Sequence, residues 1–285
     1  MSVSKLKTFE SCAAKFKFCY IDKLPKIDRD FHIFGKFIHF ILEQFHKHMI
    51  SHPQDDWEEI LKICWAKGLG GMKNFSSEFS EEQYKEFSEE EINGYRSILT
   101  KDQIPEAKEI LYEYKEILKE EGIPNIINVE KPFYINVNNQ ILLNGFIDRI
   151  QIDKDKMIHV ADYKTTKDKK YLDDFFQVKT YCFALMLADE SIKKIRASFI
   201  LLRHHFDYMT EEYTREEILS EVPKKFVEGA NKILEERLFR PSPQFLCKYC
   251  DYLTSCKAGE DFLQRRGIYK AKIEKPLMVG IQKHW

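Results

Sequence analysis

Hydrophobic residues recur at three- and four-residue steps in the first half of the chain, which is the spacing of one helix face. This spacing predicts a helix over 4–20 whose apolar face carries Leu6, Phe9, Cys12, Phe16 and Cys19. Ser2 or Ser4 is suited to cap its start. A second helix is predicted over 31–50, where the apolar stripe also carries His39. Residues 55–121 are expected to form several further helices, with breaks near 68–71 and 104–105.

The period changes after residue 124, where apolar and β-branched residues alternate. We expect strands over 126–137, 140–152 and 157–164, separated by turns at 138–139 and 153–156. A helix over 171–188, two strands over 194–203 and 205–213, and a last helix over 216–239 follow. The pattern therefore predicts an α/β fold in which helices pack on a compact mixed sheet.

The composition is that of a globular protein, because 44% of the 285 residues are hydrophobic and 32% are charged. The 45 lysines and arginines are balanced by 46 acids, so a polyanionic partner requires a local basic patch. The most apolar stretch, 181–188, is shorter than the roughly 18–20 residues that span a membrane. The first residues lack the apolar core of a secretory signal. We expect a cytoplasmic (intracellular) protein with no membrane partner, whose seven cysteines are ligands and core residues.

Two carboxylates and a lysine fall on consecutive predicted strands. A hairpin would bring Asp148 and Asp162 to one edge, and Asp162 and Lys164 share a face because side chains alternate along a strand. Carboxylate oxygens bind Mg²⁺ or Mn²⁺, which activate water for phosphodiester hydrolysis. Lys164 would orient that water or steady the phosphate. Taken alone, such a triplet is more typical of solvated residues at a loop edge than of a metal site, because it is common by chance.

Three cysteines near the end of the chain, Cys247, Cys250 and Cys256, supply three closely spaced soft ligands. A tetrahedral metal site or an iron–sulfur cubane needs a fourth thiolate, which must come from far away in the sequence. Cys12 and Cys19 lie seven residues apart on the same predicted helix face. By count alone, a structural zinc fits as well as a cluster.

These motifs together resemble the PD-(D/E)xK nucleases, in particular the RecB-like branch with AddB, exonuclease V and the CRISPR-associated adaptation nucleases. The residues that carry the resemblance follow the family's order along nearly the whole chain: Leu6-x2-Phe9-x2-Cys12, Gly35-x3-His39-x2-Leu42-Glu43, Gly145-Phe146-Ile147-Asp148-Arg149, Ala161-Asp162-Tyr163-Lys164-Thr165, Gln177-x3-Tyr181 and the Cys247, Cys250, Cys256 group. One departure is that Asp162 stands where many adaptation nucleases have Glu, which favours the RecB and AddB type.

The resemblance implies a restriction-endonuclease-like mixed sheet flanked by helices, with a helical insertion and an iron–sulfur clasp that joins the two termini. It divides the chain into an N-terminal helix with a cluster cysteine (1–30), a helical region with the metal-binding histidine (31–122), the nuclease core (123–240) and an iron–sulfur segment (241–285). The implied activity is a metal-dependent DNA exonuclease that acts on single-stranded DNA or DNA ends, in repair, recombination or CRISPR/phage DNA processing. The alternative is a non-catalytic DNA-binding or assembly module of a helicase or integrase complex.

The resemblance also implies roles for individual residues. Asp148, Asp162 and Lys164 would be catalytic, and the metal, Mg²⁺ or Mn²⁺, would be held by His39, Asp148, Asp162 and the carbonyl of Tyr163. Gln177 and Tyr181 would contact DNA or support the active site. A [4Fe-4S] cluster would be bound by Cys12, Cys247, Cys250 and Cys256, which leaves Cys19, Cys64 and Cys182 as core thiols.

Several other residues are weaker candidates for the same site. Glu43, one turn after His39, is expected either to orient the metal site or to be solvated, and Glu130 is ranked below the other candidates because a glutamate at a strand edge is ordinary. Tyr163, Tyr171 and Phe176 are expected mainly in the core, with stacking on unpaired bases as the alternative. The candidate basic patch comprises Arg149, Lys167, Lys169, Lys170, Lys179, Arg203, Lys248 and Lys257.

Overall fold

The computed structural model describes residues 1–27, 29–78, 85–169, 172 and 174–268. The chain divides into two compact units. Unit 1 consists of Met1–Leu6 with Asp28–Glu235, and unit 2 consists of Lys7–Ile27 with Glu236–Trp285. Lys170 and Tyr171 of the sequence predictions lie outside the described residues. None of the helices in the described part of the chain is long and apolar enough to cross a membrane.

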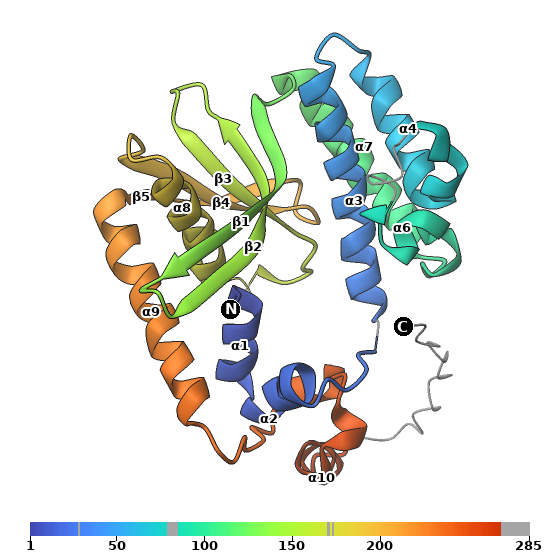
Figure 1. The fold of residues 1–285 in the computed structure, drawn as a ribbon. Coiled ribbons are helices and arrows are strands. Elements are labelled where there is room, and N and C mark those ends of the chain that lie inside the picture. Colours follow the sequence, from blue (N-terminus) through green and yellow to red (C-terminus); the bar gives the residue numbers. More distant parts are fainter. Residues whose placement is uncertain (28, 79–84, 170–171, 173, 269–285) are drawn as a thin grey trace. The chain divides into compact units, whose positions relative to one another are not determined.

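Unit 1 is built on a five-stranded mixed sheet in the order β1-β2-β3-β4-β5 (Figure 1). The strands are β1 (Ile126–Val137), β2 (Ile141–Ile152), β3 (Ile158–Lys164), β4 (Lys194–Leu201) and β5 (Asp207–Thr214). Only the β3–β4 pair is parallel, and the other pairs are antiparallel. A parallel pair needs a crossover connection, and α8 (Phe176–Ala188) supplies it. The predicted mixed sheet flanked by helices is therefore confirmed.

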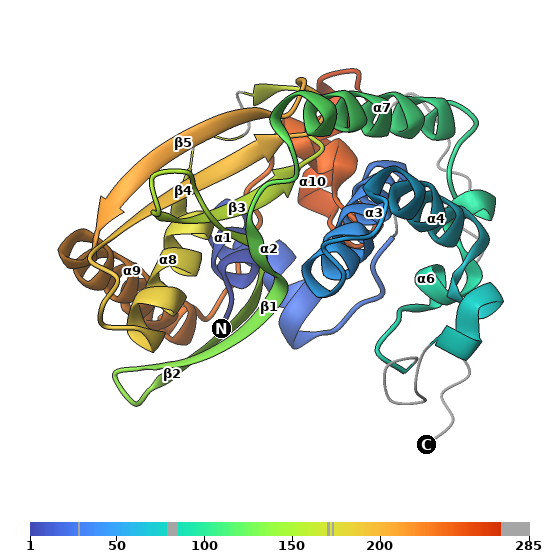
Figure 2. The ribbon, with the colours of Figure 1, turned by 90° about the horizontal axis from the view of Figure 1, so that it is seen from above.

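Helices cover both faces of the sheet, and the alternation of side chains along the strands assigns each residue to one of two cores. Val160 points into the first core, with α8 and α9 (Arg215–Glu235). Ala161 and Tyr163 point into the second core, with α3 (Asp30–Ser51), α4 (Trp57–Gly70) and α7 (Gln103–Glu121). Figure 2 shows α8 and α9 on one side of the sheet and α3 and α7 on the other. Residues on β3 therefore reach both helical layers.

The helical region before the sheet follows the predicted breaks. The helix α4 ends at Gly70, and Gly71 has a φ of +86°. A Cβ atom on Gly71 would lie 2.5 Å from the nitrogen of Gly94, so glycine is needed for this close backbone approach. The short elements η2 (Met72–Glu78), α6 (Glu89–Asn93) and η3 (Tyr95–Ser97) follow, and Ser88 begins α6 with a capping box.

The predicted single helix over 4–20 is wrong at Cys12. The helix α1 (Val3–Ser11) ends there, because the Cys12 backbone is extended, with φ −163° and ψ 110°. Cys12 instead precedes α2 (Ala13–Phe16), which runs into the π-helix η1 (Lys17–Ile21). Unit 2 also contains η5 (Phe245–Tyr249), η6 (Leu253–Ser255) and α10 (Lys257–Arg265). The apolar spacing continues across the break, so it gave no sign of the interruption.

Candidate active site

The β2–β3 hairpin brings Asp148 and Asp162 together. The last paired residues before the site are Arg149 and Ala161. Beyond them, the backbone N–H of Tyr163 donates a hydrogen bond to Oδ2 of Asp148, at 3.2 Å. The Asp148 side chain thus bonds to the backbone of β3 where the two strands stop pairing. Asp162 is 1% exposed and the Asp148 side chain is 12% exposed, so both carboxylates are held at a well-packed point of the sheet.

The long helix α3 adds His39 to this point. The Nε2 atom of His39 lies 2.9 Å from the carbonyl oxygen of Tyr163, and Nδ1 lies 3.5 Å from Oδ2 of Asp148. Burial is the main cause that lowers the pKa of His39. The imidazole is therefore neutral at physiological pH, which is the form that binds a metal ion.

Glu130 belongs to the same cluster, although it ranked low from the sequence. It lies on β1 between Val129, which pairs with Arg149, and Lys131, which pairs with Ile147, so the register places it opposite Asp148. Ligand atoms of His39, Glu130 and Asp148 lie within 4.8 Å of one another. Glu130 has a φ of +47°, an uncommon backbone conformation for a non-glycine residue. The signal that could have found it is the β1–β2 register.

The helix α8 supplies Gln177 and Tyr181, one turn apart on the same face. The Nε2 of Gln177 donates to Oδ1 of Asp162 at 2.6 Å and to the hydroxyl of Tyr181 at 2.9 Å. The Tyr181 hydroxyl donates to the same Asp162 oxygen at 3.0 Å and lies 3.4 Å from Oδ1 of Asp148. Both residues therefore hold the carboxylates in place.

Lys164 completes the arrangement at the end of β3. Its ammonium forms an ion pair with Asp162 and donates to Oε1 of Gln177 at 2.9 Å. It also lies 5.2 Å from the centre of the Phe199 ring, a cation–π contact. The predicted neighbours Asp162 and Lys164 are thus in contact, and Gln177 bridges them.

The carboxylates repel one another electrostatically. Burial raises the pKa of Asp148 well above its usual range, and the nearby Asp162 and Glu130 raise it further. Burial, with Glu43 nearby, raises the pKa of Glu130 to about 7. Glu43 itself pairs with Lys47 at 2.5 Å. Desolvated like charges favour protonation, and a divalent cation would relieve the same repulsion.

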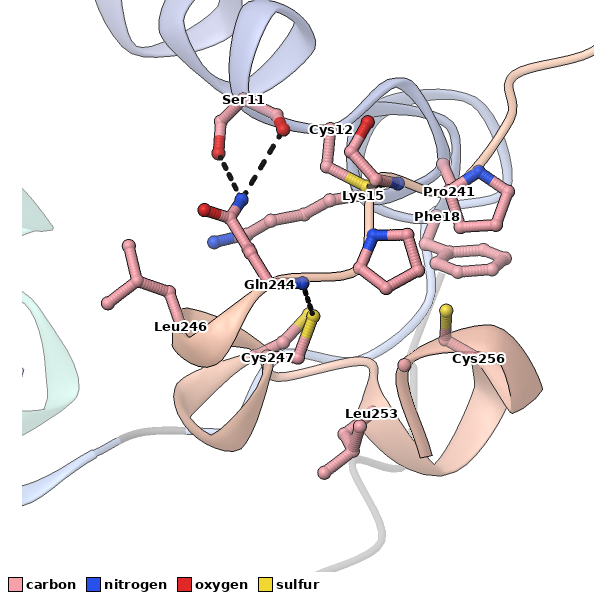
Figure 3. Close-up of a pocket in the computed structure, with 15 residues that line it drawn as sticks. Ser11, Cys12, Lys15, Phe18, Pro241, Gln244, Leu246, Cys247, Leu253 and Cys256 are labelled. Carbon is pink, nitrogen blue, oxygen red and sulfur yellow. Dashed lines mark hydrogen bonds between the residues drawn. The ribbon is translucent and has the colours of Figure 1, made fainter. Parts of the chain in front are cut away.

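The four cysteines expected at a cluster line one hollow of about 110 Å³ within unit 2 (Figure 3). The backbone N–H of Ser242 donates to Sγ of Cys12 at 3.4 Å, and that of Gln244 donates to Sγ of Cys247 at 3.3 Å. Burial raises the pKa of the Cys250 and Cys256 thiols. Cys64 and Cys182 lie in the hydrophobic cores, as predicted. Cys19 was expected there too, but it is half-buried and belongs to neither core.

Two of the other sequence predictions are settled by burial. Arg149 is 2% exposed and donates from Nη1 to the Tyr163 hydroxyl, so its place in the basic patch was wrong. Tyr163 and Phe176 are 4% and 2% exposed, which confirms that they are core residues and rules out stacking on bases. Several lysines and arginines of the predicted patch are paired with acids: Lys169 with Asp207, Lys179 with Glu221 and Arg203 with Glu106.

Residues 1–257 match the PD-(D/E)XK nuclease superfamily. Because this match covers most of the chain, the protein belongs to that superfamily, whose members use divalent metal ions. The restriction-endonuclease-like fold inferred from the motifs is thereby confirmed.

Among curated proteins, the chain is similar to one of the subunits of the ATP-dependent helicase/deoxyribonuclease of Streptococcus pyogenes. The two are 26% identical over 187 residues, which are 64% of this chain and 16% of that protein. The same protein from another strain of this species is 25% identical over 187 residues. The chain thus spans only 16% of the length of these relatives. Among solved structures, a candidate exonuclease from Eubacterium rectale has a TM-score of 0.46 and 13% sequence identity, and the alignment covers 99% of this chain and 93% of that chain.

Proposed function

We propose that the protein is a metal-dependent DNA exonuclease that hydrolyses phosphodiester bonds on single-stranded DNA or at DNA ends. The observation that carries the proposal is the convergence of His39, Glu130 and Asp148 beside the Asp162–Lys164 ion pair. DNA as the substrate is supported by the name of the Streptococcus pyogenes relative, which is part of a helicase/deoxyribonuclease. That name also supports a helicase as the partner. The proposed setting, which follows from the motifs alone, is DNA repair, recombination or CRISPR/phage DNA processing.

The proposed ion is Mg²⁺ or Mn²⁺, because carboxylate and carbonyl oxygens are the ligands that these ions prefer. His39, Asp148, Asp162 and the carbonyl of Tyr163 would hold it, with Glu130 as a further carboxylate. The buried acids fit this role, since their crowding keeps protons on them that a cation would displace. When bound, the ion neutralises charge that develops on the phosphate and lowers the pKa of water.

Lys164 is the proposed catalytic cation. Asp162 and Gln177 fix its ammonium, so its remaining donor capacity is available to a phosphate oxygen or to the attacking water. Gln177 and Tyr181 are positioning residues, because each donates a hydrogen bond to Asp162 and so fixes the direction of that carboxylate. The proton that water loses on attack has nearby acceptors in the carboxylates.

A [4Fe-4S] cluster bound by Cys12, Cys247, Cys250 and Cys256 is the proposed second cofactor. One water needs roughly 10–15 Å³ of such a hollow, so the space of about 110 Å³ suits a group of several atoms better than a single zinc ion. The backbone N–H donors on Cys12 and Cys247 are of the kind that tune cluster sulfurs. When bound, the cluster would tie residues 7–27 to 236–268.

The activity is tested by two substitutions on an end-labelled oligonucleotide with Mg²⁺ or Mn²⁺. Asp162→Ala and Lys164→Ala should each lower the hydrolysis rate by at least about 10³-fold, since a metal ligand and a charge-stabilising group are lost. Lys62→Ala and Glu59→Ala are matched controls, because they disrupt an exposed pair of opposite charges on α4, away from the acid site. Unchanged hydrolysis in both active-site variants would refute the proposed site, and DNA binding without hydrolysis in the wild type would favour a non-catalytic module.

A further inference from the structure

One face of the β1–β2 hairpin carries large apolar side chains that are exposed. Tyr134, Leu142 and Phe146 are 72%, 60% and 54% exposed. The ladder pairs Pro132 with Phe146, Tyr134 with Asn144 and Asn136 with Leu142. Directly paired residues project to the same side of a sheet, and alternate pairs share that side. We call the face formed by these six residues the hairpin face.

The opposite side of the hairpin is buried. Ile135, Leu143 and Ile147 belong to the first hydrophobic core, with α8 and α9. Figure 2 shows the hairpin curving past α8, which lies on the core side. The exposure of Tyr134, Leu142 and Phe146 therefore follows from the strand period. Exposed aromatic and aliphatic side chains in a row indicate a binding surface.

The hairpin face begins next to the candidate metal site. Phe146 is two residues from Asp148 on β2, and Tyr134 is four residues from Glu130 on β1. A strand rises about 3.3 Å per residue, so these rings lie roughly 7 and 13 Å along the strands from the two carboxylates. A strand of nucleic acid with a phosphate at the carboxylates would place its next nucleotides within reach of this face.

We propose that the hairpin face is a stacking surface for the unpaired bases of the DNA strand whose end lies in the metal site. This inference rests on the proposed function and narrows its substrate to DNA with unpaired bases. Phe146 and Tyr134 offer ring faces, on which any base stacks regardless of sequence. Asn136 and Asn144 lie between the apolar side chains and offer amide groups to base edges.

The residue composition and the position of the hairpin face favour a nucleic acid over a protein as the molecule that binds there. Two of its three residue pairs contain an asparagine, Asn144 opposite Tyr134 and Asn136 opposite Leu142, so the face lacks the continuous apolar centre that a protein interface buries. The nearest ring of this face, that of Phe146, is also only two residues along β2 from Asp148, one of the carboxylates of the candidate metal site. Bases in a duplex are stacked on one another, so the hairpin face distinguishes unpaired from paired DNA.

The test compares two labelled oligonucleotides of equal length, oligothymidylate and a strand of abasic sugar phosphates. Affinity is measured by fluorescence anisotropy in an Asp162→Asn background, so that binding is measured without cleavage. Phe146→Ala and Tyr134→Ala should each weaken oligothymidylate binding by roughly 5- to 150-fold, which is the loss of one stacked base. Affinity for the abasic strand should change by less than about twofold.

The control variants separate stacking from folding. Phe146→Tyr and Tyr134→Phe keep a ring and should retain the preference for bases. Tyr112→Ala removes an aromatic side chain that is 63% exposed on α7, and it should alter neither affinity. Circular dichroism melting of each variant checks that the fold is kept.

Three results would overturn the inference. The first is equal affinity of the parent protein for the two strands, and the second is an equal loss of both affinities in the alanine variants. The third is that the variants abolish binding of a helicase partner while base preference is unchanged, which would assign the face to a protein. These results are independent of hydrolysis, so a failed stacking surface and a failed nuclease site are told apart.

Discussion

The acid site and the cysteine pocket are held by very different frameworks. His39, Glu130 and Asp148 come from elements of 22, 12 and 12 residues that pack on two hydrophobic cores. The cysteines come from short elements, such as the five-residue η5 and the four-residue helix that follows Cys12. Among the described residues, neither core includes a side chain of 7–27 or 236–268.

This difference determines what a bound metal does in each place. A large packed framework can hold like charges together at a cost in free energy, and a cation then lowers that cost without being needed for the fold. A small segment without a sizeable core depends on its metal group for stability. Phe245, Leu246 and Tyr249 in unit 2 are each at least 50% exposed, which is consistent with a segment that buries little apolar surface by itself.

The largest expected effect is therefore the loss of a cysteine ligand. Cys250→Ser should remove the bound iron and sulfide and open unit 2, because the proposed cluster supplies most of its stability. Iron content, visible absorbance and limited proteolysis after anaerobic purification measure this, and cleavage should fall within 236–268. Cys19→Ser is the matched control, since Cys19 does not line the hollow. Zinc in place of iron and sulfide, or an intact unit 2 in Cys250→Ser, would contradict the prediction.

The second effect is a pH dependence of stability in the acid site. The pKa of Glu130 rises from 4.5 when unfolded to about 7 when folded, so the folded state binds more protons between these values. The free energy of unfolding should therefore fall as pH rises from about 4.5 to 7, by at most about 3 kcal/mol from this residue. Chemical denaturation in EDTA measures this fall, and Glu130→Gln should reduce it.

His46 changes the pH dependence of stability in the direction opposite to Glu130. A His46 variant therefore shows whether the measured dependence comes from Glu130. Burial and the nearby Arg149 lower the pKa of His46 well below 6.5. Here the unfolded state binds more protons, so stability is lost as pH falls below about 6.5. His46→Gln should steepen the decline of stability towards high pH, whereas Glu130→Gln should flatten it. Equal slopes in both variants would contradict the assignment.

The third effect is smaller and concerns metal affinity. Glu130→Gln removes one charge from the group of His39, Glu130 and Asp148, and we expect Mn²⁺ binding to weaken by about tenfold. Isothermal titration calorimetry on the whole protein measures this change. Glu120→Gln, at an exposed position on α7, should bind Mn²⁺ as the wild type does. Unchanged affinity in Glu130→Gln would remove Glu130 from the proposed ligand set.

The sequence predicted the parts of the site that depend on local periodicity. Alternation along β3 placed Asp162 beside Lys164, and helical spacing placed Gln177 and Tyr181 on one face; both contacts are present. The strands and α3 were predicted nearly to their ends for the same reason. The functional roles of these residues remain predictions.

The remaining features depend on tertiary structure. Glu130 joins the site through the β1–β2 register and a left-handed backbone conformation, and neither leaves a mark in the local pattern. The break at Cys12 was missed because the apolar face continues across it. Arg149 has the charge of a surface residue, yet it is buried and bonds to Tyr163, because it pairs with Ala161, which faces the second core.

The smallest expected effect is a faster loss of the proposed cluster when Gly259, beside the cysteine pocket, is replaced by alanine. A Cβ atom on Gly259 would lie 3.3 Å from Cδ1 of Leu253 and 3.5 Å from Sγ of Cys256, which is close but not a severe clash. Gly259→Ala should therefore keep the cluster but speed its loss in air by a few-fold, because the pocket wall must shift by tenths of an ångström. The decay of visible absorbance measures this rate. Ala258→Gly, next to the same site, is the control. Gly267→Ala is less suitable, because Gly267 has a φ of +66° and an alanine there would strain the backbone. The cluster in Gly259→Ala could instead be lost at the wild-type rate while Cys250→Ser still loses all its iron. In that case the cysteines bind the cluster and Gly259 is not part of the pocket wall.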